Sequence, residues 1–401
     1  MDSNVILLAP AGDRERLEMA LLYGADAVYL AGEAYGMRAS SCNFSRDAMA
    51  QAVSLCHRAG AELHVTCNTL PREHELAALP EYLGFLQEIG VDALIIADLG
   101  VFAMVRQYAP RIRKHVSTQL GVINSATATE LYRMGADTVV LARETTMEEI
   151  RQIRKNTPSE LKLEAFVHGA MCVSFSGRCL LSNYLTGRDA NRGQCAQPCR
   201  WKYHLVEEKR PGQYFEISED GGTHIMNSRD MRMIEHIPEL LEAGVSSLKI
   251  EGRMKSAYYT AVVTNAYRHA IDEALSGQPL SRVWLEETEK LSHRPYSTGF
   301  YYGEPGQIYG ESSYESSSDV MAVVENCDTD GLAHLTQRGK FSRGDTLELL
   351  LPEGKPIAFT AEHIFDADGT EIEDTRRAMM PFTMRLPCPV PKNAIVRKNR
   401  S

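Results

Sequence analysis

Short apolar runs alternate with amphipathic stretches through the first 250 residues of the chain. Stretches such as RERLEMALLYG and RDAMAQAVSLCHRAG carry apolar residues at helical spacing. Several end in a glycine just before the next apolar run, as at Gly24 and Gly60, and glycine commonly ends a helix. A repeated strand–helix unit predicts a parallel sheet. Eight runs are the candidate strands: residues 5–9, 27–31, 63–67, 93–97, 116–119, 138–142, 163–167 and 247–250.

The number of runs decides between two α/β folds. Eight strand–helix units are typical of a (β/α)8 barrel. A doubly wound open sheet is the alternative, but no GxGxxG follows the first run. We therefore predict a TIM-like barrel as the catalytic domain, over residues 1–293.

A long insertion separates the seventh and eighth runs, over about residues 169–246. It contains two predicted strands, KYHLVEE and QYFEISE, and a predicted helix over residues 229–242. It leaves the carboxyl end of the seventh strand, the face at which barrel enzymes carry out their chemistry. Insertions of this length are usually functional.

The texture changes after residue 293. Residues 294–318 are rich in Gly, Ser and Tyr and are expected to form a linker and lid. Six short apolar runs then recur at about ten-residue spacing, from DVMAVVEN to AIVRK. This pattern predicts a small antiparallel β-barrel over residues 319–401.

Composition narrows the function classes. The net charge is −10, which argues against a nucleic-acid binder with a basic surface throughout but leaves room for a local basic patch. The start of the chain lacks the basic segment and apolar core of a signal peptide. The sequence contains no run of 18 apolar residues, so we expect no membrane span. We expect a cytoplasmic protein, whose nine cysteines are thiols or ligands rather than disulfides.

Four of those cysteines fall in one Gly-, Ser- and Arg-rich loop of the insertion, with the spacing C-x6-C-x15-C-x3-C. Thiolates are the usual ligands of iron–sulfur clusters. The loop lacks the paired CxxC of zinc ribbons, although a structural zinc and reactive single thiols remain alternatives. The candidate ligands are Cys172, Cys179, Cys195 and Cys199.

Polar side chains follow the predicted strands and should line the barrel mouth. At least three are cations, which suits an anionic small molecule or a phosphate, the alternative being a solvated rim of salt bridges. The candidates are Arg38, Asn68, Gln119, Arg143, Lys249, Glu251 and Arg253.

Glu164 and His168 belong to the seventh run and its end. Four residues apart in a strand, they should point to the same side and could activate a water, with or without zinc. The chain has no HExxH motif and no nucleophile elbow, and His168 could equally be structural.

The segment EAFVHGAMCVSFSGRCLLS, residues 164–182, resembles the signature of the collagenase-like peptidase family, peptidase family U32. LLAPAGDRERLEMALLYGADAVYLAG, RGQCAQPCRWKY, MNSRDM and SLKIEGRMKS are also similar to family motifs, so the resemblance covers essentially the whole chain. It implies a barrel-type catalytic domain and, as in longer members, a C-terminal β-barrel.

The resemblance implies two kinds of chemistry. The family name implies a metal-dependent peptidase, for which Glu164 and His168 are the candidate catalytic residues. Several members instead hydroxylate RNA or quinones and hold a [4Fe-4S] cluster through this loop. The layout is most similar to members that hydroxylate the wobble uridine of tRNA at carbon 5, with prephenate, a dicarboxylate, as co-substrate. This reading implies tRNA and prephenate, or a similar small carboxylate, as partners, with Arg143 and Glu251 as catalytic candidates.

One departure concerns the fourth ligand. The family places it in the segment matching MNSRDMRM, where this chain has Arg232. Cys172, Cys179 and Cys195 match the first three ligands, and Cys199 or Cys42 could be the fourth. For RNA contact, Arg188, Arg192, RGQCAQPCRWK and the tail VRKNR supply local positive charge. A homo-oligomer or a sister subunit is a further expectation.

Overall fold

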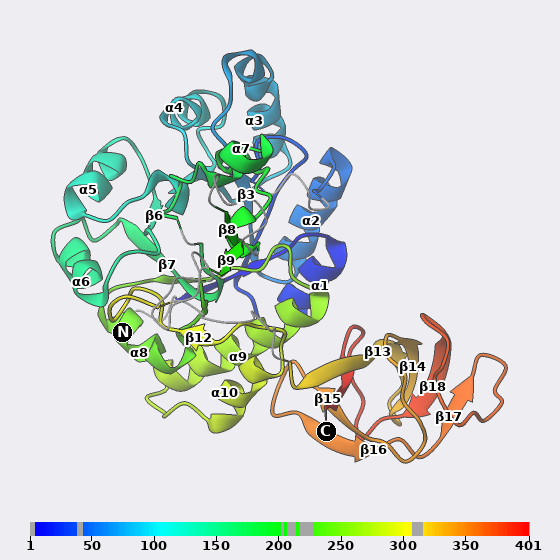
Figure 1. Ribbon diagram of the computed structural model, residues 1–401. Coiled ribbons are helices and arrows are strands. Elements are labelled where there is room, and N and C mark those ends of the chain that lie inside the picture. Colours follow the sequence, from blue (N-terminus) through cyan, green and yellow to red (C-terminus); the bar gives the residue numbers. More distant parts are fainter. Residues whose placement is uncertain are drawn as a thin grey trace.

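The computed structural model describes residues 5–37, 43–172, 174–201, 204–206, 214–216, 228–306 and 316–400. Eight parallel strands close into a barrel, because β11 pairs with both β7 and β1 (Figure 1). This confirms the TIM-like fold and excludes the open sheet. The barrel strands are β1 (Ile6–Pro10), β2 (Ala27–Leu30), β3 (Glu62–Cys67), β4 (Ala93–Ile96), β5 (Arg113–Val116), β6 (Thr138–Val140), β7 (Lys162–Ala170) and β11 (Ser247–Ile250).

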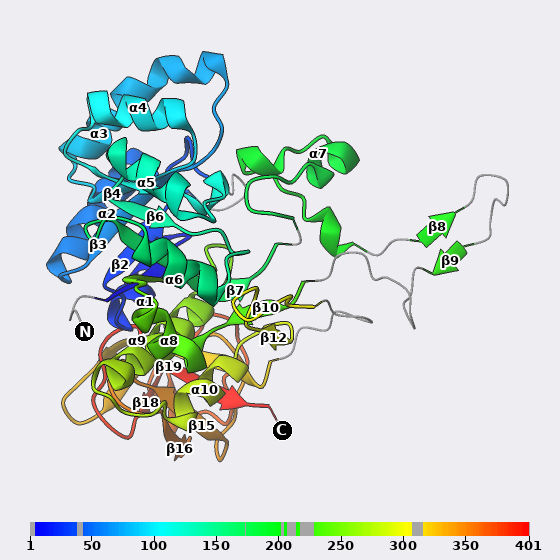
Figure 2. The ribbon, with the colours of Figure 1, turned by 90° about the vertical axis from the view of Figure 1, so that its left-hand side faces the viewer.

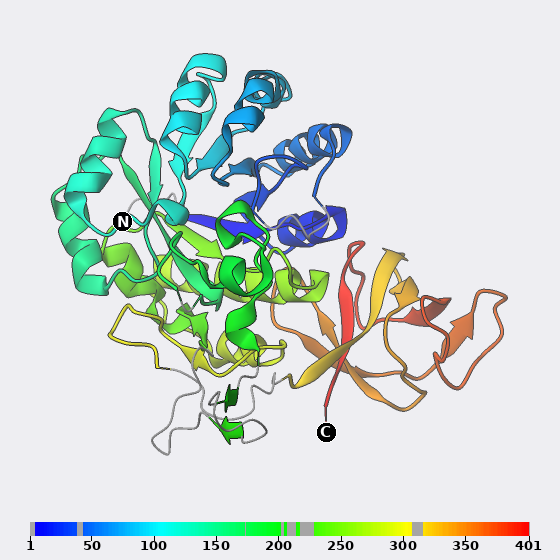
Figure 3. The same ribbon diagram turned by 45° about the horizontal axis from the view of Figure 1, so that its top comes forward.

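Helices surround the barrel and bury its main apolar core against the outer faces of the strands (Figure 3). Side-chain caps start them, as Asp13 does for α1 and Thr146 with Glu149 for α6. Left-handed glycines such as Gly24 follow their ends. The helices are α1 (Arg14–Leu22), α2 (Arg46–Arg58), α3 (Leu79–Glu88), α4 (Leu99–Tyr108), α5 (Ser125–Arg133), α6 (Met147–Lys155), α8 (Ile237–Glu242), α9 (Ala257–Leu275) and α10 (Arg282–Glu289). No described helix is both long and apolar enough to cross a bilayer.

The fifth strand corrects one prediction. It was expected at residues 116–119, but β5 ends at Val116 and residues 118–120 form a 3-10 turn. β5 begins with the charged residues Arg113 and Lys114, so its sequence lacks the apolar run by which the other strands were recognised. Arg113 is the first residue of β5, and its charge is compensated by an ion pair with Glu62, 2.8 Å away at the start of β3. The Ser117 side chain accepts the Gln119 N–H and turns the chain.

The insertion also differs from expectation in one part. A short helix, α7 (Leu181–Thr186), follows the first cysteines, and β8 (His204–Val206) pairs antiparallel with β9 (Tyr214–Glu216) (Figure 2). The helix expected over residues 229–242 begins only at Ile237, after a 3-10 turn. Before it, β10 (Asp230–Arg232) pairs antiparallel with the end of β7, because Asp230 is drawn to Arg294 and Met231 is buried.

The expected linker over residues 294–318 is partly barrel wall. Arg294 is buried and forms an ion pair with Asp230 at 2.7 Å. β12 (Tyr296–Ser297) adds to β10, and the Tyr301 hydroxyl donates to the Phe166 carbonyl at 2.6 Å. Residues 307–315 lie outside the described residues.

The C-terminal domain is one antiparallel sheet that curls as a half-barrel around its own apolar core (Figure 1). The run IAFTAEHIFD, expected as one strand, forms two, because Ala361 is buried in a turn and its N–H donates to Asp345. Sheet order is β16-β15-β19-β13-β14-β18-β17, with β13 (Ser318–Cys327), β14 (Leu332–Gln337), β15 (Thr346–Leu350), β16 (Ile357–Thr360), β17 (Ile364–Asp366), β18 (Pro381–Arg385) and β19 (Ile395–Asn399).

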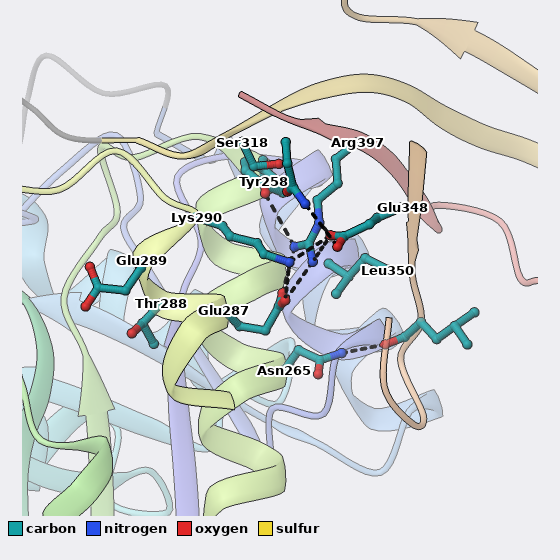
Figure 4. A network of polar contacts seen from close by, with 12 residues as sticks. Tyr258, Asn265, Glu287, Thr288, Glu289, Lys290, Ser318, Glu348, Leu350 and Arg397 are labelled. Carbon is teal, nitrogen blue, oxygen red and sulfur yellow. Dashed lines mark hydrogen bonds and ion pairs between the residues drawn. The ribbon is translucent and has the colours of Figure 1, made fainter. Parts of the chain in front are cut away.

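A buried ionic network joins this domain to the barrel (Figure 4). Arg397 of β19 is fully buried and donates two hydrogen bonds of 2.6 Å to Glu287 of α10. Glu348 of β15 lies 2.9 Å from Arg397 and 2.7 Å from Lys290. Two parallel bonds to one carboxylate fix orientation as well as distance, so the network holds β19 against α10.

Candidate active site

The carboxyl ends of the barrel strands and the cysteine loop enclose one pocket, with a cavity volume of about 150 Å³. A cavity of that size holds one benzene-sized ring. Six predicted mouth residues line it: Asn68, Gln119, Arg143, Lys249, Glu251 and Arg253. Three of the predicted cysteines line it with them, namely Cys172, Cys179 and Cys195.

Lys249 of β11 lies at the base of this pocket. Its Nζ is 2.8 Å from Glu164 Oε1, and both side chains are almost fully buried. Ser247 donates to the other Glu164 oxygen at 2.8 Å. The Lys249 ammonium also lies over the Tyr29 ring, 4.7 Å from its centre. Glu164 therefore engages Lys249 and Ser247 below the pocket and does not line it.

Arg143 follows β6 and lies against one wall of the pocket. Its Nη2 is 3.0 Å from Glu251, and its guanidinium stacks 4.1 Å from the centre of the Phe166 ring. Arg253, which is 4% exposed, donates to the Thr66 hydroxyl at 3.2 Å. Three cations thus meet at one small cavity with Glu251 among its lining residues, an arrangement suited to a carboxylate ligand.

His168 lies on the other side of the barrel wall. Lys249 pairs with Phe166 but Ile250 pairs with His168, so a β-bulge in β7 interrupts the alternation of side chains. The expectation that Glu164 and His168 share one side is therefore wrong. His168 packs among Tyr259, Tyr267 and Tyr296, with its Nδ1 3.3 Å from the Tyr267 hydroxyl. Burial lowers the pKa of His168 to about 3.

The cysteine loop is fastened to the barrel rim at two places. Ser176 donates its N–H and its hydroxyl to Glu144, both at 3.0 Å. Arg192 makes two bonds to Glu75, at 2.8 and 2.9 Å. Gly177 has a φ of +75°, and a Cβ there would lie 1.9 Å from the Gln119 carbonyl oxygen. Only glycine allows the loop to pass this close to the rim.

The thiols are soft-metal ligands by donor type, and Cys172, Cys179 and Cys195 share the pocket lining. Cys195 Sγ accepts the Gln197 N–H at 3.3 Å, a contact that also tunes sulfur ligands. Cys199 lies in the 3-10 turn Pro198–Arg200 and is not part of the pocket lining. Within the described residues, no three His, Cys, Asp or Glu side chains are gathered closely enough to hold a metal ion as they stand. Arg38 and Cys42 lie outside the described residues.

Several pocket residues were missed by counting only strand ends. Tyr29, Thr66 and Phe166 lie within β2, β3 and β7 and point inward. Strand alternation could have found Phe166, which is two residues from the inward-facing Glu164. Ser174 and Asn191 come from the insertion, whose path over the mouth no local pattern gives.

Both domains of the chain resemble one known protein family. Residues 12–310 match the peptidase family U32, and residues 316–397 match the peptidase family U32 C-terminal domain. The chain belongs to peptidase family U32. The family's two matched regions correspond to the barrel with its cysteine insertion and to the half-barrel.

Two relatives in the family match this chain along nearly its whole length. The tRNA hydroxylation protein P1 of Bacillus subtilis is 37% identical over 98% of this chain and 94% of its own. The tRNA hydroxylation protein P of Escherichia coli is 37% identical over 90% of this chain and 89% of its own. A collagenase of Porphyromonas gingivalis is 33% identical over 74% of this chain and 73% of its own.

Proposed function

We propose that this family U32 protein is an RNA-modifying enzyme that hydroxylates tRNA, forming 5-hydroxyuridine at the wobble position. The observation that carries the proposal is the meeting of three thiols and three cations in one ring-sized pocket. The named activity of the two relatives that match both domains supports tRNA as the substrate.

The cations have a role in this reaction as the site of a small carboxylate co-substrate, prephenate or a similar acid. Arg143 and Arg253 would bind carboxylate oxygens, and Lys249 would contribute charge from below. Phe166 and Glu251 orient Arg143 by stacking and by hydrogen bonding, so its guanidinium is held before the ligand arrives. Asn68 and Gln119 offer amide groups to a ring substituent.

Cys172, Cys179 and Cys195 would hold a [4Fe-4S] cluster, with Cys199 or Cys42 as the fourth ligand. A bound cluster would supply redox chemistry beside the carboxylate site. Cys199 is four residues from Cys195 in the same loop, which makes it a candidate although it does not line the pocket. Zinc in the same thiols is the alternative centre.

A collagenase-like peptidase is the second candidate, and the geometry favours it less. Its two predicted catalytic residues are separated by the barrel wall, with Glu164 bonded to Lys249 and His168 buried among tyrosines. Neither side chain lines the pocket. The collagenase relative also matches a smaller share of the chain than the tRNA hydroxylation proteins.

The function is tested by deleting the gene and measuring tRNA nucleosides by mass spectrometry. We expect 5-hydroxyuridine and its derivatives to disappear, and a plasmid copy to restore them. Persistence in a strain without a paralogue would reject the function. Anaerobic purification with iron, sulfide and zinc analysis tests the centre: about four irons and four sulfides are expected, and stoichiometric zinc without sulfide would replace the cluster by a zinc site.

A further inference from the structure

The large exposed apolar side chains are concentrated around the barrel mouth. Thirteen occur among the described residues. Eight of these lie on the insertion or on loops that follow barrel strands, and a ninth, Leu99, begins the helix that follows β4. Exposed apolar side chains that gather at one end of a molecule are candidates for an interaction site. Five belong to the insertion, which we call the insertion face: Phe175, Leu180, Tyr184, Leu185 and Trp201. The other four are Leu70, Leu99, Ile123 and Met254.

The insertion face stands on a firmly held base. Ser182 of α7 is fully buried and accepts the Ala196 N–H at 3.0 Å. Arg192 ties the following turn to Glu75 on the rim. From this base Tyr184 projects with 84% of its surface exposed. Figure 2 shows α7 standing off the end of the barrel at which β7 leaves it. The backbone that carries Tyr184 is thus fixed, and its ring is open to a flat partner.

The same segment carries a local positive charge. Residues 171–201 contain four arginines and one acidic residue, Asp189, whereas the whole chain has a net charge of −10. Arg192 is engaged by Glu75. Arg178 and Arg188 are exposed, and within the described residues neither guanidinium forms an ion pair. Cationic side chains between exposed rings are the composition that binds unpaired nucleotides, through phosphates and base stacking.

The pocket limits what the surface can present to it. Phe175, Cys179 and Cys195 line the pocket, so the insertion face is continuous with the pocket mouth. A cavity of about 150 Å³ admits one base but not a base pair. The target nucleotide must therefore be unpaired and turned out of its stack. Its neighbours in the strand then lie outside the pocket, over the insertion face.

We propose that the insertion face is a stacking platform for the unpaired nucleotides beside the target base, with Tyr184 and Trp201 as the stacking rings and Arg178 and Arg188 as phosphate contacts. The proposal rests on the proposed function and deepens it, because it names the side chains that bind the unpaired nucleotides on either side of the target base. It commits to RNA, and association with a second copy of the chain is an outcome of the test.

The test is fluorescence anisotropy of the full-length protein with a labelled anticodon stem-loop RNA and with a duplex of the same length. Tyr184→Ala and Trp201→Ala should each weaken stem-loop binding about 5- to 150-fold, the range for loss of one base stack. Tyr108→Ala is the matched control, because Tyr108 is an exposed ring at the far end of α4, and it should change the Kd less than about twofold. Arg178→Gln should reduce the salt dependence of binding by about 0.7 in the slope of log K against log salt.

Two outcomes would overturn the platform. One is wild-type stem-loop affinity in both ring variants. The other is a wild-type dimer that Tyr184→Ala dissociates without weakening RNA binding, which would make the insertion face an interface between copies. The proposed function fails separately. If both ring variants restore wild-type 5-hydroxyuridine to a deletion strain and bind the stem-loop normally, the platform is wrong and the function stands. If the ring variants lose stem-loop binding but the deletion strain keeps its 5-hydroxyuridine, the platform stands and the function is wrong.

Discussion

Lys249 and Glu164 form a buried ion pair, 2.8 Å long, at the base of the pocket. The Glu164 carboxylate compensates the charge of Lys249, and this explains how the ammonium can remain charged although it is buried below the pocket. It also gives Glu164 a positioning role, since its two oxygens are engaged by Lys249 and Ser247. A carboxylate bonded in this way orients the ammonium and does not reach a ligand in the pocket.

The first prediction concerns this pair. Lys249→Met should lower the free energy of unfolding by about 3–5 kcal/mol, because it leaves the Glu164 carboxylate buried without its partner. The double variant Glu164→Gln/Lys249→Met should lose less than the sum of the two single losses, since it leaves no buried charge behind. Urea unfolding of the four proteins measures the coupling. Strict additivity would show that the two side chains do not interact.

The second prediction concerns the carboxylate site. Arg143→Ala and Arg253→Ala should each weaken prephenate binding by about 2–5 kcal/mol, because each removes a buried partner of a charged ligand. Arg46→Ala is the control, as Arg46 pairs with Glu81 on the exposed surface of α2. Isothermal titration with the anaerobically purified protein gives the affinities. Unchanged binding in both pocket variants would exclude an anion site there.

The third prediction concerns pH. Burial lowers the pKa of His168 to about 3, whereas an unfolded histidine titrates near 6.5. The unfolded chain therefore binds a proton between these values that the folded chain does not. Stability from this group is complete above pH 6.5 and falls by about 1.4 kcal/mol per pH unit as the pH drops toward 3.

Between pH 3 and 6.5, His168→Asn should reduce the slope of the unfolding free energy against pH by about 1.4 kcal/mol per pH unit. The asparagine amide can still donate toward the Tyr267 hydroxyl. His115 is also buried with a lowered pKa, so part of the dependence should remain. Denaturant titrations at pH 7, 6 and 5 make the comparison. Identical slopes in variant and wild type would mean that His168 binds a proton as readily in the folded protein as in the unfolded chain.

The fourth prediction concerns the joint between the domains. Arg397→Met should destabilise the protein by about 3–5 kcal/mol, because Lys290 alone would then face the carboxylates of Glu287 and Glu348, which leaves one negative charge of the network uncompensated. Arg400→Met is the matched control: its partner Asp319 is half exposed, and such a pair contributes about 0–1 kcal/mol. Thermal unfolding monitored in both domains tests this. Equal losses in the two variants would contradict a structural role for the network.

The barrel could be predicted because its signal is local and repeated. Five helices are followed by a left-handed glycine before the next apolar strand, and eight strands permit closure of the sheet. The glycines are Gly24, Gly60, Gly90, Gly135 and Gly244. β5 was predicted too late in the sequence because it begins with the charged Arg113. That residue is tolerated in the strand because it pairs with Glu62 of β3, and no local pattern shows this partner. The split of residues 229–242 has the same cause, since Asp230 forms an ion pair with Arg294 and its strand pairs with β7 and β12, all distant in the sequence.

The candidate site was predictable where it follows strand ends or shares one loop. Arg143, Lys249 and Arg253 lie at the pocket for the first reason, and Cys172, Cys179 and Cys195 for the second. The placement of His168 was not predictable, because one extra residue in β7 reverses the side of the strand on which it lies. A bulge is set by pairing with β11 and leaves no mark in the sequence of β7 alone.

The central claim is that the thiols of this pocket carry tRNA hydroxylation. The most direct measurement is the amount of 5-hydroxyuridine in tRNA from a deletion strain that expresses variants in which one cysteine is replaced, at equal protein levels. Cys179→Ser should give none, whereas Cys327→Ser, which changes a thiol in the C-terminal half-barrel, should restore the wild-type amount. Full restoration by Cys179→Ser, or equal loss in both variants, would contradict the account.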